Sequence, residues 1–386
     1  MKETAMKNMK KLIIFLLVSA FFIAMIPQKA SASISVSAQS AILMEQGSGR
    51  VLYEKNADKP MRIASITKIM TAILAIESGK MDEMVKVSEK AVHAEGSSIY
   101  LIPGEKIKLE DLVYGLMLRS GNDAAVAIAE HVGGSLDGFV YLMNQKAEEI
   151  GMTNTHFANP HGLDDHENHL SSAYDMALLT RYAMNNSKYK KISGTKVYKS
   201  PHPEENWDRK WTNKNRLLTE LYDYTTGGKT GFTKRAKRTL VTTATKGKLD
   251  LIAVTLNGPD DWNDHIQMYE TGYKTYSLVE VLSEGTIKEI DDEFYKKKVY
   301  VDHSFDYPVT SKEKNKFRIE YKMKKPNREW EDNIPDIVGQ AIVYFNEQPV
   351  KTMPIYYKQG EEKDKQSFFE LFRSLFTAMI GVKTDG

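Results

Sequence analysis

The chain comprises 386 residues, 41% of them apolar and 27% charged, with no cysteine and a formal net charge of +2. This length accommodates two or three domains, and the composition is that of a folded globular protein, which excludes a disordered or fibrous chain. Without cysteine the chain forms no disulfides, and its small net charge gives no electrostatic reason to bind nucleic acid.

The first 32 residues have the pattern of a secretory signal peptide. Four lysines within residues 2–11 precede an apolar run over 12–26, and a small-residue site, Ala30-Ser31-Ala32, follows. The run is shorter than the about 20 residues that a membrane-spanning helix needs; an uncleaved N-terminal anchor is the alternative. Since residues 1–32 carry five lysines and one glutamate, the rest of the chain has a formal charge of −2. We therefore expect an exported protein that begins, once processed, after Ala32.

Residues 33–284 have the pattern of a sheet interrupted by helices. Apolar runs predict strands over 40–44, 51–53, 240–244 and 251–256. Apolar residues at helical spacing predict helices over 65–78, 109–118, 123–131 and 174–184. Strands at both ends with helices between them indicate an α+β fold, in which the terminal strands pair around a helical insertion.

The composition changes near residue 285. Short alternating runs over 298–301, 317–321 and 341–345 predict a small β-rich domain that occupies 285–357. Residues 358–386 then supply a charged linker and a last apolar stretch.

That last stretch has the pattern of an amphipathic helix. Seven apolar residues fall on one helical face: Phe368, Leu371, Phe372, Leu375, Phe376, Met379 and Ile380. A helix of this length is about 20 Å long, too short for a hydrocarbon core of about 30 Å. We therefore predict a peripheral anchor that lies in the plane of the membrane; the alternative is a helix that packs on the protein itself.

Three short motifs indicate the chemistry, and they occur in this order: Ser65-Ile66-Thr67-Lys68, Ser120-Gly121-Asn122 and Lys229-Thr230-Gly231. Each is weak alone, because a serine that starts a helix is often a simple cap and Ser-Gly-Asn is common in turns. Together they are specific, because they supply a nucleophile, a base and a cation for the substrate.

Ser65 and Lys68 lie three residues apart and so share one face of the predicted helix. A serine hydroxyl is a poor nucleophile unless a neighbour takes its proton, and a lysine can do so only when neutral. Burial and the positive end of a helix both lower the pKa of a lysine. The backbone N–H of Ser65, at the helix start, is also suited to stabilise an oxyanion.

Around these motifs, residues 40–272 resemble the low-molecular-mass penicillin-binding proteins, which are serine-type D-alanyl-D-alanine carboxypeptidases. The matching stretches are 62–72, 118–125, 159–163, 172–177 and 227–231. The resemblance implies a β-lactamase/transpeptidase-like domain, an antiparallel sheet flanked by helices, and the β-rich second domain and amphipathic tail fit the same layout. Within the family, the chain is most similar to the sporulation subgroup of endospore-forming bacteria, which trims spore-cortex peptidoglycan.

The resemblance implies a catalytic role for the first two motifs. Ser65 attacks the carbonyl between the two terminal D-alanines of a peptidoglycan stem peptide, and Lys68 takes its proton. Ser120 relays a proton to the leaving amine, held by Asn122, whose amide also contacts the substrate. Water hydrolyses the acyl-enzyme, β-lactams acylate the same serine, and no metal or organic cofactor is needed.

The resemblance also implies that the third motif holds the substrate. Lys229 and Thr230 bind the terminal carboxylate, and Gly231 leaves room for the peptide along the strand edge. The backbone N–H groups of Ser65 and Phe232 form the oxyanion hole. Such an enzyme acts at the outer face of the cytoplasmic membrane, in the cell wall or around the forespore.

Two other hydrolases are alternatives. A class A β-lactamase adds a Glu-x-x-Leu-Asn loop, and residues 167–171 (Glu-Asn-His-Leu-Ser) are one residue short of that pattern. A zinc hydrolase would use the polar cluster over 156–169, whose ligand-type residues are His156, His161, Asp164, Asp165, His166 and His169. Their spacing fits no metal motif, so solvated loop histidines are the favoured interpretation.

A third alternative is not an enzyme. A β-lactam sensor or peptidoglycan-binding scaffold would be acylated at Ser65 but would hardly turn over. Motifs do not separate slow from fast hydrolysis, whereas steady-state release of D-alanine does.

Overall fold

The computed structural model describes residues 34–202, 205–327, 330 and 334–358. The predicted signal peptide and the predicted amphipathic helix both lie outside these residues, and both stay predictions. Within the described part of the chain, no helix is long and apolar enough to cross a membrane.

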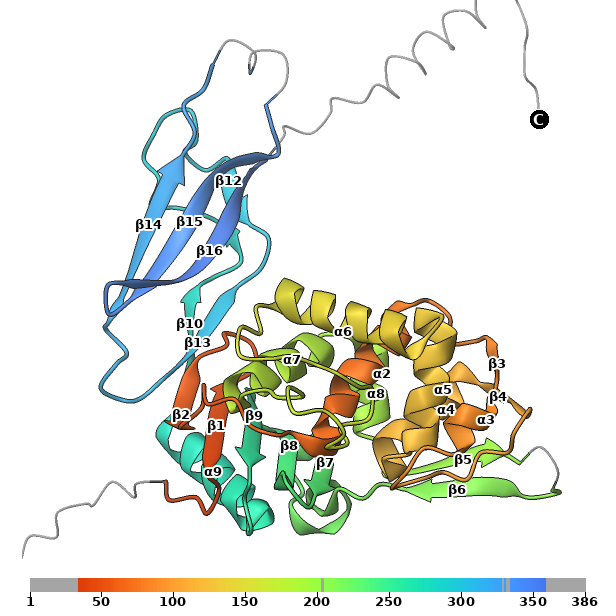
Figure 1. Ribbon diagram of the computed structural model, residues 1–386. Helices are drawn as coiled ribbons and strands as arrows, with labels where there is room; N and C mark the ends of the chain where they lie inside the picture. The colour runs from red at the N-terminus through yellow and green to blue at the C-terminus, as the bar shows by residue number, and fades with distance from the viewer. Residues whose placement is uncertain (1–33, 203–204, 328–329, 331–333, 359–386) are drawn as a thin grey trace, which may run out of the picture. The chain divides into compact units, whose positions relative to one another are not determined.

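A five-stranded antiparallel sheet is the centre of the first, larger region (Figure 1). Its strands, in spatial order, are β2 (Val51–Lys55), β1 (Ser40–Glu45), β9 (Leu249–Leu256), β8 (Lys237–Lys246) and β7 (Thr225–Thr233). β1 pairs with β9 from Ser40 opposite Leu256 to Glu45 opposite Leu251, so strands from both ends of the region are neighbours. The predicted pairing of terminal strands around a helical insertion is confirmed, and β7 is left at one edge of the sheet.

The insertion between β2 and β7 is mainly helical. Its helices are α2 (Lys68–Glu77), α3 (Glu89–Val92), α4 (Leu109–Arg119), α5 (Asn122–Gly133), α6 (Leu136–Ile150), α7 (Ala173–Met184), α8 (Ser187–Ser193) and a short π-helical turn (Leu217–Leu221). Two hairpins accompany them, β3 (Met84–Lys86) with β4 (Lys106–Lys108), and β5 (Val197–Pro201) with β6 (Asp208–Thr212). The predicted helices over 109–118, 123–131 and 174–184 are confirmed as α4, α5 and α7.

Helices cover both faces of the sheet. Val241 of β8 and Val254 of β9 are fully buried in one apolar cluster with residues of α2 and α7. On the opposite face lies α9 (Asp261–Thr275), whose His265 shares hydrogen bonds of 2.6 Å with Thr242 and 3.0 Å with Thr255. The sheet is thus a rigid, two-sided support for its edge strand β7.

Two motifs have a different local structure from the one predicted. Lys229-Thr230-Gly231 lies inside β7, where no strand was predicted, because this glycine-rich segment pairs along its length with β8. Ser65 lies in a 3₁₀ turn (Ala64–Thr67), and the α-helix begins only at Lys68.

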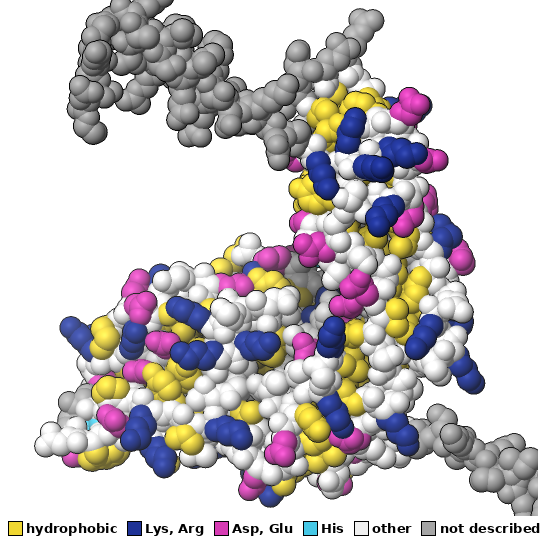
Figure 2. Space-filling model, turned by 180° about the vertical axis from the view of Figure 1, so that it is seen from behind, with side chains coloured by type: hydrophobic (Ala, Val, Ile, Leu, Met, Phe, Trp, Pro, Cys, Tyr) yellow, Lys and Arg dark blue, Asp and Glu magenta, His cyan; other side chains and the backbone are white. Residues whose placement is uncertain are grey.

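The remaining described residues are β-rich. Their strands are β10 (Ser277–Leu282), β11 (Gly285–Thr286), β12 (Val299–Val301), β13 (Phe305–Val309), β14 (Phe317–Met323), β15 (Ile337–Phe345) and β16 (Gln348–Tyr357). They form a five-stranded sheet in the order β11-β12-β16-β15-β14 and a separate pair, β10-β13, around their own apolar cluster. The β-rich second region is confirmed, whereas the limits given for each domain stay predictions. Basic and acidic side chains are interspersed over the face shown in Figure 2, in keeping with the near-neutral charge.

Candidate active site

The turn that carries Ser65 is held in a strained conformation by its neighbours. Ala64 has a φ of +49°, a left-handed value that is uncommon for a residue with a side chain. The hydroxyl of Thr67 donates to the Ala64 carbonyl at 2.8 Å, and Thr239 of β8 donates to the Ile63 carbonyl at 2.9 Å. Such strain persists where the surrounding structure fixes it and is concentrated at functional sites.

Lys68 is fully buried, and its Nζ has three partners. It lies 2.7 Å from Asn122 Oδ1, 2.6 Å from the His161 carbonyl and 3.0 Å from Ser65 Oγ. The first two partners can only accept a hydrogen bond, whereas the serine hydroxyl can also donate. When Lys68 is neutral, two of its N–H bonds face the fixed acceptors, so its lone pair is directed to the Ser65 hydroxyl.

The environment favours this neutral form. Burial lowers the pKa of Lys68 well below its usual range, and the nearby charges of Lys229 and Lys214 lower it further. The geometry and the charge distribution therefore suit a base that takes the proton of Ser65.

Ser120 and Asn122 lie where α4 ends and α5 begins. Ser120 is the C-terminal cap of α4 and has a φ of +67°, which turns the chain sharply so that Asn122 starts the next helix. The Asn122 amide donates to the Glu95 carbonyl through Nδ2, which leaves Oδ1 for Lys68. The second motif is therefore joined to the first by a direct hydrogen bond.

Lys229 joins the third motif to the second. Its buried Nζ donates to Ser120 Oγ at 3.1 Å and to the Thr230 carbonyl at 2.7 Å. Burial lowers the pKa of Lys229 to about 7, and the nearby charge of Lys214, which donates to Ser97 Oγ at 3.3 Å, adds to this shift. Lys229 and Lys214 thus place positive charge beside the neutral Lys68, which attracts an anion such as a carboxylate.

Gly231 lets the edge strand approach the Ser65 turn closely. A Cβ at this position would lie 2.3 Å from Thr239 Oγ1 and 3.0 Å from the backbone nitrogen of Ser65. The next residue, Phe232, has a largely exposed side chain, and β7 has no strand on its outer side in this sheet. The edge of β7 and the N–H of Ser65 therefore lie side by side, and an edge strand is able to pair with an extended peptide.

The loop over 156–169 packs against the same turn. His161 supplies its carbonyl to Lys68, and Gly162, with a φ of +88°, lies so close to Ala64 that a Cβ would be 1.9 Å from the Ala64 carbonyl oxygen. Thr67 also bonds to Nε2 of His169 at 2.8 Å. The loop is therefore part of the wall around Ser65 and Lys68.

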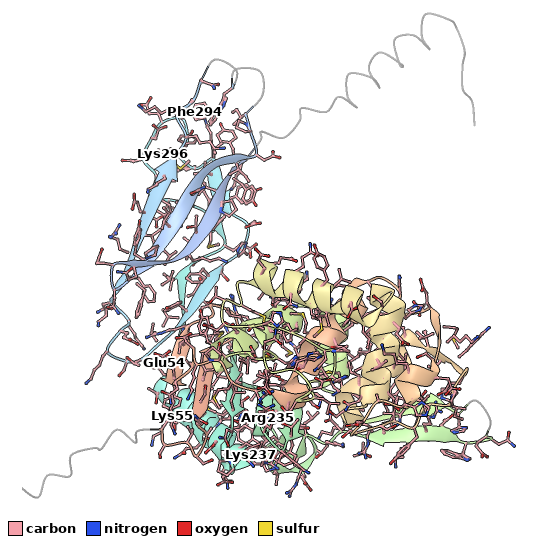
Figure 3. The ribbon with its side chains drawn as sticks, in the orientation of Figure 1. Glu54, Lys55, Arg235, Lys237, Phe294 and Lys296 are labelled. Carbon is pink, nitrogen blue, oxygen red and sulfur yellow. The ribbon has the colours of Figure 1, made fainter. Side chains whose placement is uncertain are left out.

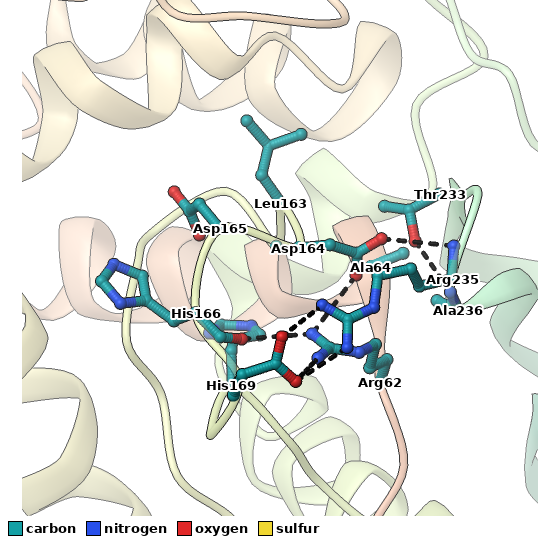
Figure 4. A network of polar contacts seen from close by, with 12 residues as sticks. Arg62, Ala64, Leu163, Asp164, Asp165, His166, His169, Thr233, Arg235 and Ala236 are labelled. Carbon is teal, nitrogen blue, oxygen red and sulfur yellow. Dashed lines mark hydrogen bonds and ion pairs between the residues drawn. The ribbon is translucent and has the colours of Figure 1, made fainter.

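Ion pairs fasten this loop to two neighbouring segments (Figure 4). Glu167 accepts from Arg62, which precedes the Ser65 turn, at 2.7 Å, and from both Nη atoms of Arg235 at 2.6 and 2.7 Å. Arg235 lies at the turn between β7 and β8, and Lys237 begins β8 (Figure 3). Asp164 accepts from the Arg235 backbone N–H at 3.3 Å and pairs with Arg62 at 3.7 Å. Glu167 is thus bound to two arginines.

The histidines of the loop differ from the prediction. His156 and His166 are exposed, but His161 and His169 are buried, and burial lowers the pKa of each to about 3. The interpretation that all four are solvated is therefore wrong, because two of them pack inside the loop as neutral rings. In the described ranges, no group of three His, Cys, Asp or Glu side chains is placed to hold a metal ion.

The three motifs, far apart in the sequence, are joined by direct contacts in the structure. Hydrogen bonds link Ser65, Lys68 and Asn122 on one side and Ser120 and Lys229 on the other. Sequence reasoning missed the His161 carbonyl, Lys214 and the ion pairs of Glu167. The Asn-Pro-His-Gly-Leu stretch, which matches the family, pointed to this loop but not to the role of the His161 carbonyl.

Comparison with known proteins gives two family matches. Residues 26–260 match the family described as D-alanyl-D-alanine carboxypeptidase, and residues 276–363 match the C-terminal domain of penicillin-binding protein 5. The chain is 38% identical over 285 residues to the D-alanyl-D-alanine carboxypeptidase DacF of Bacillus subtilis, covering 69% of this chain and 72% of that protein. It is 36% identical over 268 residues to DacC of Escherichia coli, covering 64% of this chain and just under two thirds, 63%, of the relative.

Solved structures agree in fold across both regions. The D-alanyl-D-alanine carboxypeptidase DacD from Francisella tularensis superposes with a TM-score of 0.64 at 26% identity, covering 86% of this chain and 95% of that one. Penicillin binding protein 5 from Haemophilus influenzae has the same fold, with a TM-score of 0.69 at 24% identity and coverage of 85% and 98%. The predicted fold class is confirmed by these likenesses.

Proposed function

The chain belongs to the D-alanyl-D-alanine carboxypeptidase family, and we propose that it is a serine D,D-carboxypeptidase that removes the terminal D-alanine of peptidoglycan stem peptides. The observation that carries the proposal is the distance of 3.0 Å between Lys68 Nζ and Ser65 Oγ. Because the other two partners of Lys68 can only accept, the amine lone pair is available to this hydroxyl alone. A hydroxyl beside a buried, neutral amine is what serine nucleophilic catalysis requires.

In the acylation step, Ser65 Oγ bonds to the carbonyl carbon between the two D-alanines while Lys68 accepts the hydroxyl proton. The carbonyl oxygen becomes an oxyanion, to which the backbone N–H groups of Ser65 and Phe232 donate. The close approach of Gly231 to the Ser65 nitrogen supports this pairing of donors. Ser65 itself thus supplies both the nucleophile and one of the two donors.

The second and third motifs handle the leaving group. Lys229 and Thr230 bind the terminal carboxylate, and Gly231 leaves the edge of β7 open to the peptide. As the C–N bond breaks, Ser120 passes a proton to the departing amine and takes up the proton that Lys68 received from Ser65, while Asn122 holds Ser120 and the substrate backbone. The contact of 3.1 Å between Lys229 Nζ and Ser120 Oγ supports this assignment, because a cation beside the hydroxyl orients it and attracts the carboxylate.

Water then attacks the ester carbonyl while Lys68 accepts its proton, and as the bond to Ser65 Oγ breaks, Lys68 returns the proton to Ser65 and frees the enzyme. The residues named here carry every step, so no metal or organic cofactor is required. A β-lactam presents its reactive amide carbonyl to Ser65 in the same way and forms a covalent adduct.

The cellular setting is part of the proposal and rests on sequence pattern. The lysine-led apolar segment over 1–32 favours export, and the apolar face over 368–380 favours peripheral attachment to the outer face of the cytoplasmic membrane. There the enzyme acts in maturation of the cell wall or the spore cortex.

The decisive test is incubation of the purified chain with an acylated peptide that ends in D-Ala-D-Ala, with assay of free D-alanine. We expect release over many turnovers that penicillin abolishes, and neither release nor penicillin labelling in Ser65→Ala. Labelling of the wild type without turnover would favour the sensor or scaffold. Release that resists penicillin but stops with a chelator would favour a zinc hydrolase.

Membrane attachment has a separate test. Removal of residues 366–386 should free the protein from vesicles while D-alanine release is kept. If the shortened chain still sediments with vesicles, the anchor lies elsewhere.

A further inference from the structure

Tyr100 combines an exposed ring with a strained backbone. Its side chain is 82% exposed, the highest value among the large apolar side chains of the described residues. Its φ is +61°, a left-handed conformation that is an outlier for a bulky residue. A scattered exposed aromatic needs no explanation, but one held in a costly conformation does, because such strain is characteristic of ligand-contacting segments.

Buried charges fix this backbone on both sides. The carboxylate of Asp123 accepts from the N–H of Ile99 at 3.0 Å and from the N–H of Leu101 at 3.2 Å. The Tyr100 carbonyl accepts from Arg209 at 3.4 Å, and Arg209 is itself paired with Glu105 in the protein interior. Each of these groups would lose a partner if Tyr100 relaxed, so the position of Tyr100 is rigid.

The same loop forms part of the candidate active site. The backbone N–H of Asn122 donates to the Ser97 carbonyl at 2.6 Å, and the Ile99 side chain lies against Gly121. Three residues of extended chain span about 10 Å at most. Tyr100 is therefore within about 10 Å of Ser97, at the side of the site formed by Ser120-Gly121-Asn122.

Phe232 is a second exposed ring, next to the third motif. Its ring is 64% exposed and follows Gly231 on the edge strand. Alternate residues of a strand share a face and lie about 6–7 Å apart, so Phe232 follows Thr230 on the same face of β7. If Thr230 binds the terminal carboxylate, Phe232 lies beside the part of the peptide upstream of the scissile bond.

We propose that Tyr100 and Phe232 are specificity-determining residues whose rings contact the amino acid that precedes D-Ala-D-Ala and favour a long aliphatic side chain there. The inference rests on the proposed carboxypeptidase function. Two exposed rings, one near the second motif and one next to the third, gain from covering methylene groups, because that removes apolar area of both partners from water.

The test compares two peptides, Nα-acetyl-Gly-D-Ala-D-Ala and Nα,Nε-diacetyl-L-Lys-D-Ala-D-Ala, with the full chain. We expect the wild type to have a higher kcat/KM for the lysyl peptide than for the glycyl peptide. Tyr100→Ala should lower the ratio of these two kcat/KM values about 4- to 60-fold, because one to three methylene groups of the lysyl side chain are then no longer covered. Tyr100→Phe keeps the ring and should keep the ratio. Tyr141→Ala, which removes another exposed tyrosine, in α6, should change neither the kcat/KM values nor their ratio.

The Tyr100→Gly variant distinguishes a structural role of Tyr100 from contact of its ring with the substrate, because glycine adopts positive φ without strain. The ratio should fall in this variant as in Tyr100→Ala, although its backbone is relieved. If Tyr100→Ala lowers kcat/KM equally for both peptides, or leaves their ratio unchanged, the inference is overturned while the carboxypeptidase function stays intact. No D-alanine release from either peptide by the wild type would overturn the proposed function and this inference with it.

Discussion

Replacing Gly162 with alanine tests how the loop over 156–169 is packed against the nucleophile. Gly162 is buried, has a φ of +88°, and lies so close to the Ser65 turn that a Cβ would be 1.9 Å from the Ala64 carbonyl oxygen. That atom belongs to the backbone, so a rotamer change cannot relieve the collision. The loop or the turn must move by about 1 Å or more to restore ordinary contact.

Two costs add in this variant. An alanine at positive φ costs about 1–2 kcal/mol, and the forced displacement adds about 1–3 kcal/mol, for a total loss of about 2–5 kcal/mol in the free energy of unfolding. Gly151 is the matched control, because its φ is +85° and a Cβ there would meet no atom within 4 Å. Gly151→Ala should therefore show only the first cost.

The variant should also lose activity. His161 precedes Gly162 and accepts from Lys68 at 2.6 Å, so a shift of the loop disturbs the base as well as the turn. A displacement of about 1 Å can lower a rate about 100-fold. We expect the rate of labelling by a fluorescent penicillin to fall about 10- to 100-fold in Gly162→Ala and to be unchanged in Gly151→Ala, with stability measured by urea unfolding. Equal losses of stability in the two variants, or an unchanged labelling rate in Gly162→Ala, would refute the close contact.

Three further predictions concern the motifs and the ion pairs. The kcat/KM for penicillin acylation should rise with pH as Lys68 loses its proton. It should fall again above pH 7, because Lys229, with a pKa of about 7, loses the charge that attracts a carboxylate. A flat profile between pH 5 and 9 would contradict this. Gly231→Ala should lower the rate of D-alanine release by at least 10-fold and should also lower the stability of the fold, because the new Cβ would lie 2.3 Å from Thr239 Oγ1. Adding Thr239→Ala removes that oxygen and should restore part of the stability. Equal stabilities of the single and double variants would argue against the clash. Glu167→Gln should slow penicillin labelling by less than about threefold, since the ion pairs of Glu167 are exposed to solvent. The difference from wild type should vanish in 1 M NaCl, which screens these pairs. A larger effect that persists in salt would mean a direct catalytic role.

Local pattern predicted the elements in which spacing and burial coincide. Helices α4, α5 and α7 were placed within about two residues at each end, because each has one apolar face directed to the core. β7 was missed because its sequence has three glycines and only one large apolar residue, Phe232. Its strand conformation comes from pairing with β8, and strand propensity depends on such context.

The buried histidines and the start of α2 were also decided by tertiary contacts. Nothing in the polar sequence over 156–169 distinguishes His161 and His169, which are buried, from His156 and His166, which are exposed. The 3₁₀ turn at Ser65 is fixed by hydrogen bonds of Thr67 and Thr239, partners that the local sequence does not disclose.

The sequence by itself determined the order and chemical types of the reactive groups, since the three motifs contain two serines, two lysines and an amide whatever the fold. Only the tertiary structure decided how they act on one another. It directs the lone pair of Lys68 to Ser65 by placing a backbone carbonyl from a residue 93 positions away beside the amine. It lowers the pKa of Lys229 through burial and the nearby Lys214. A backbone carbonyl is common to every residue, and burial is a property of the packed chain, so neither leaves a signal in the amino-acid sequence.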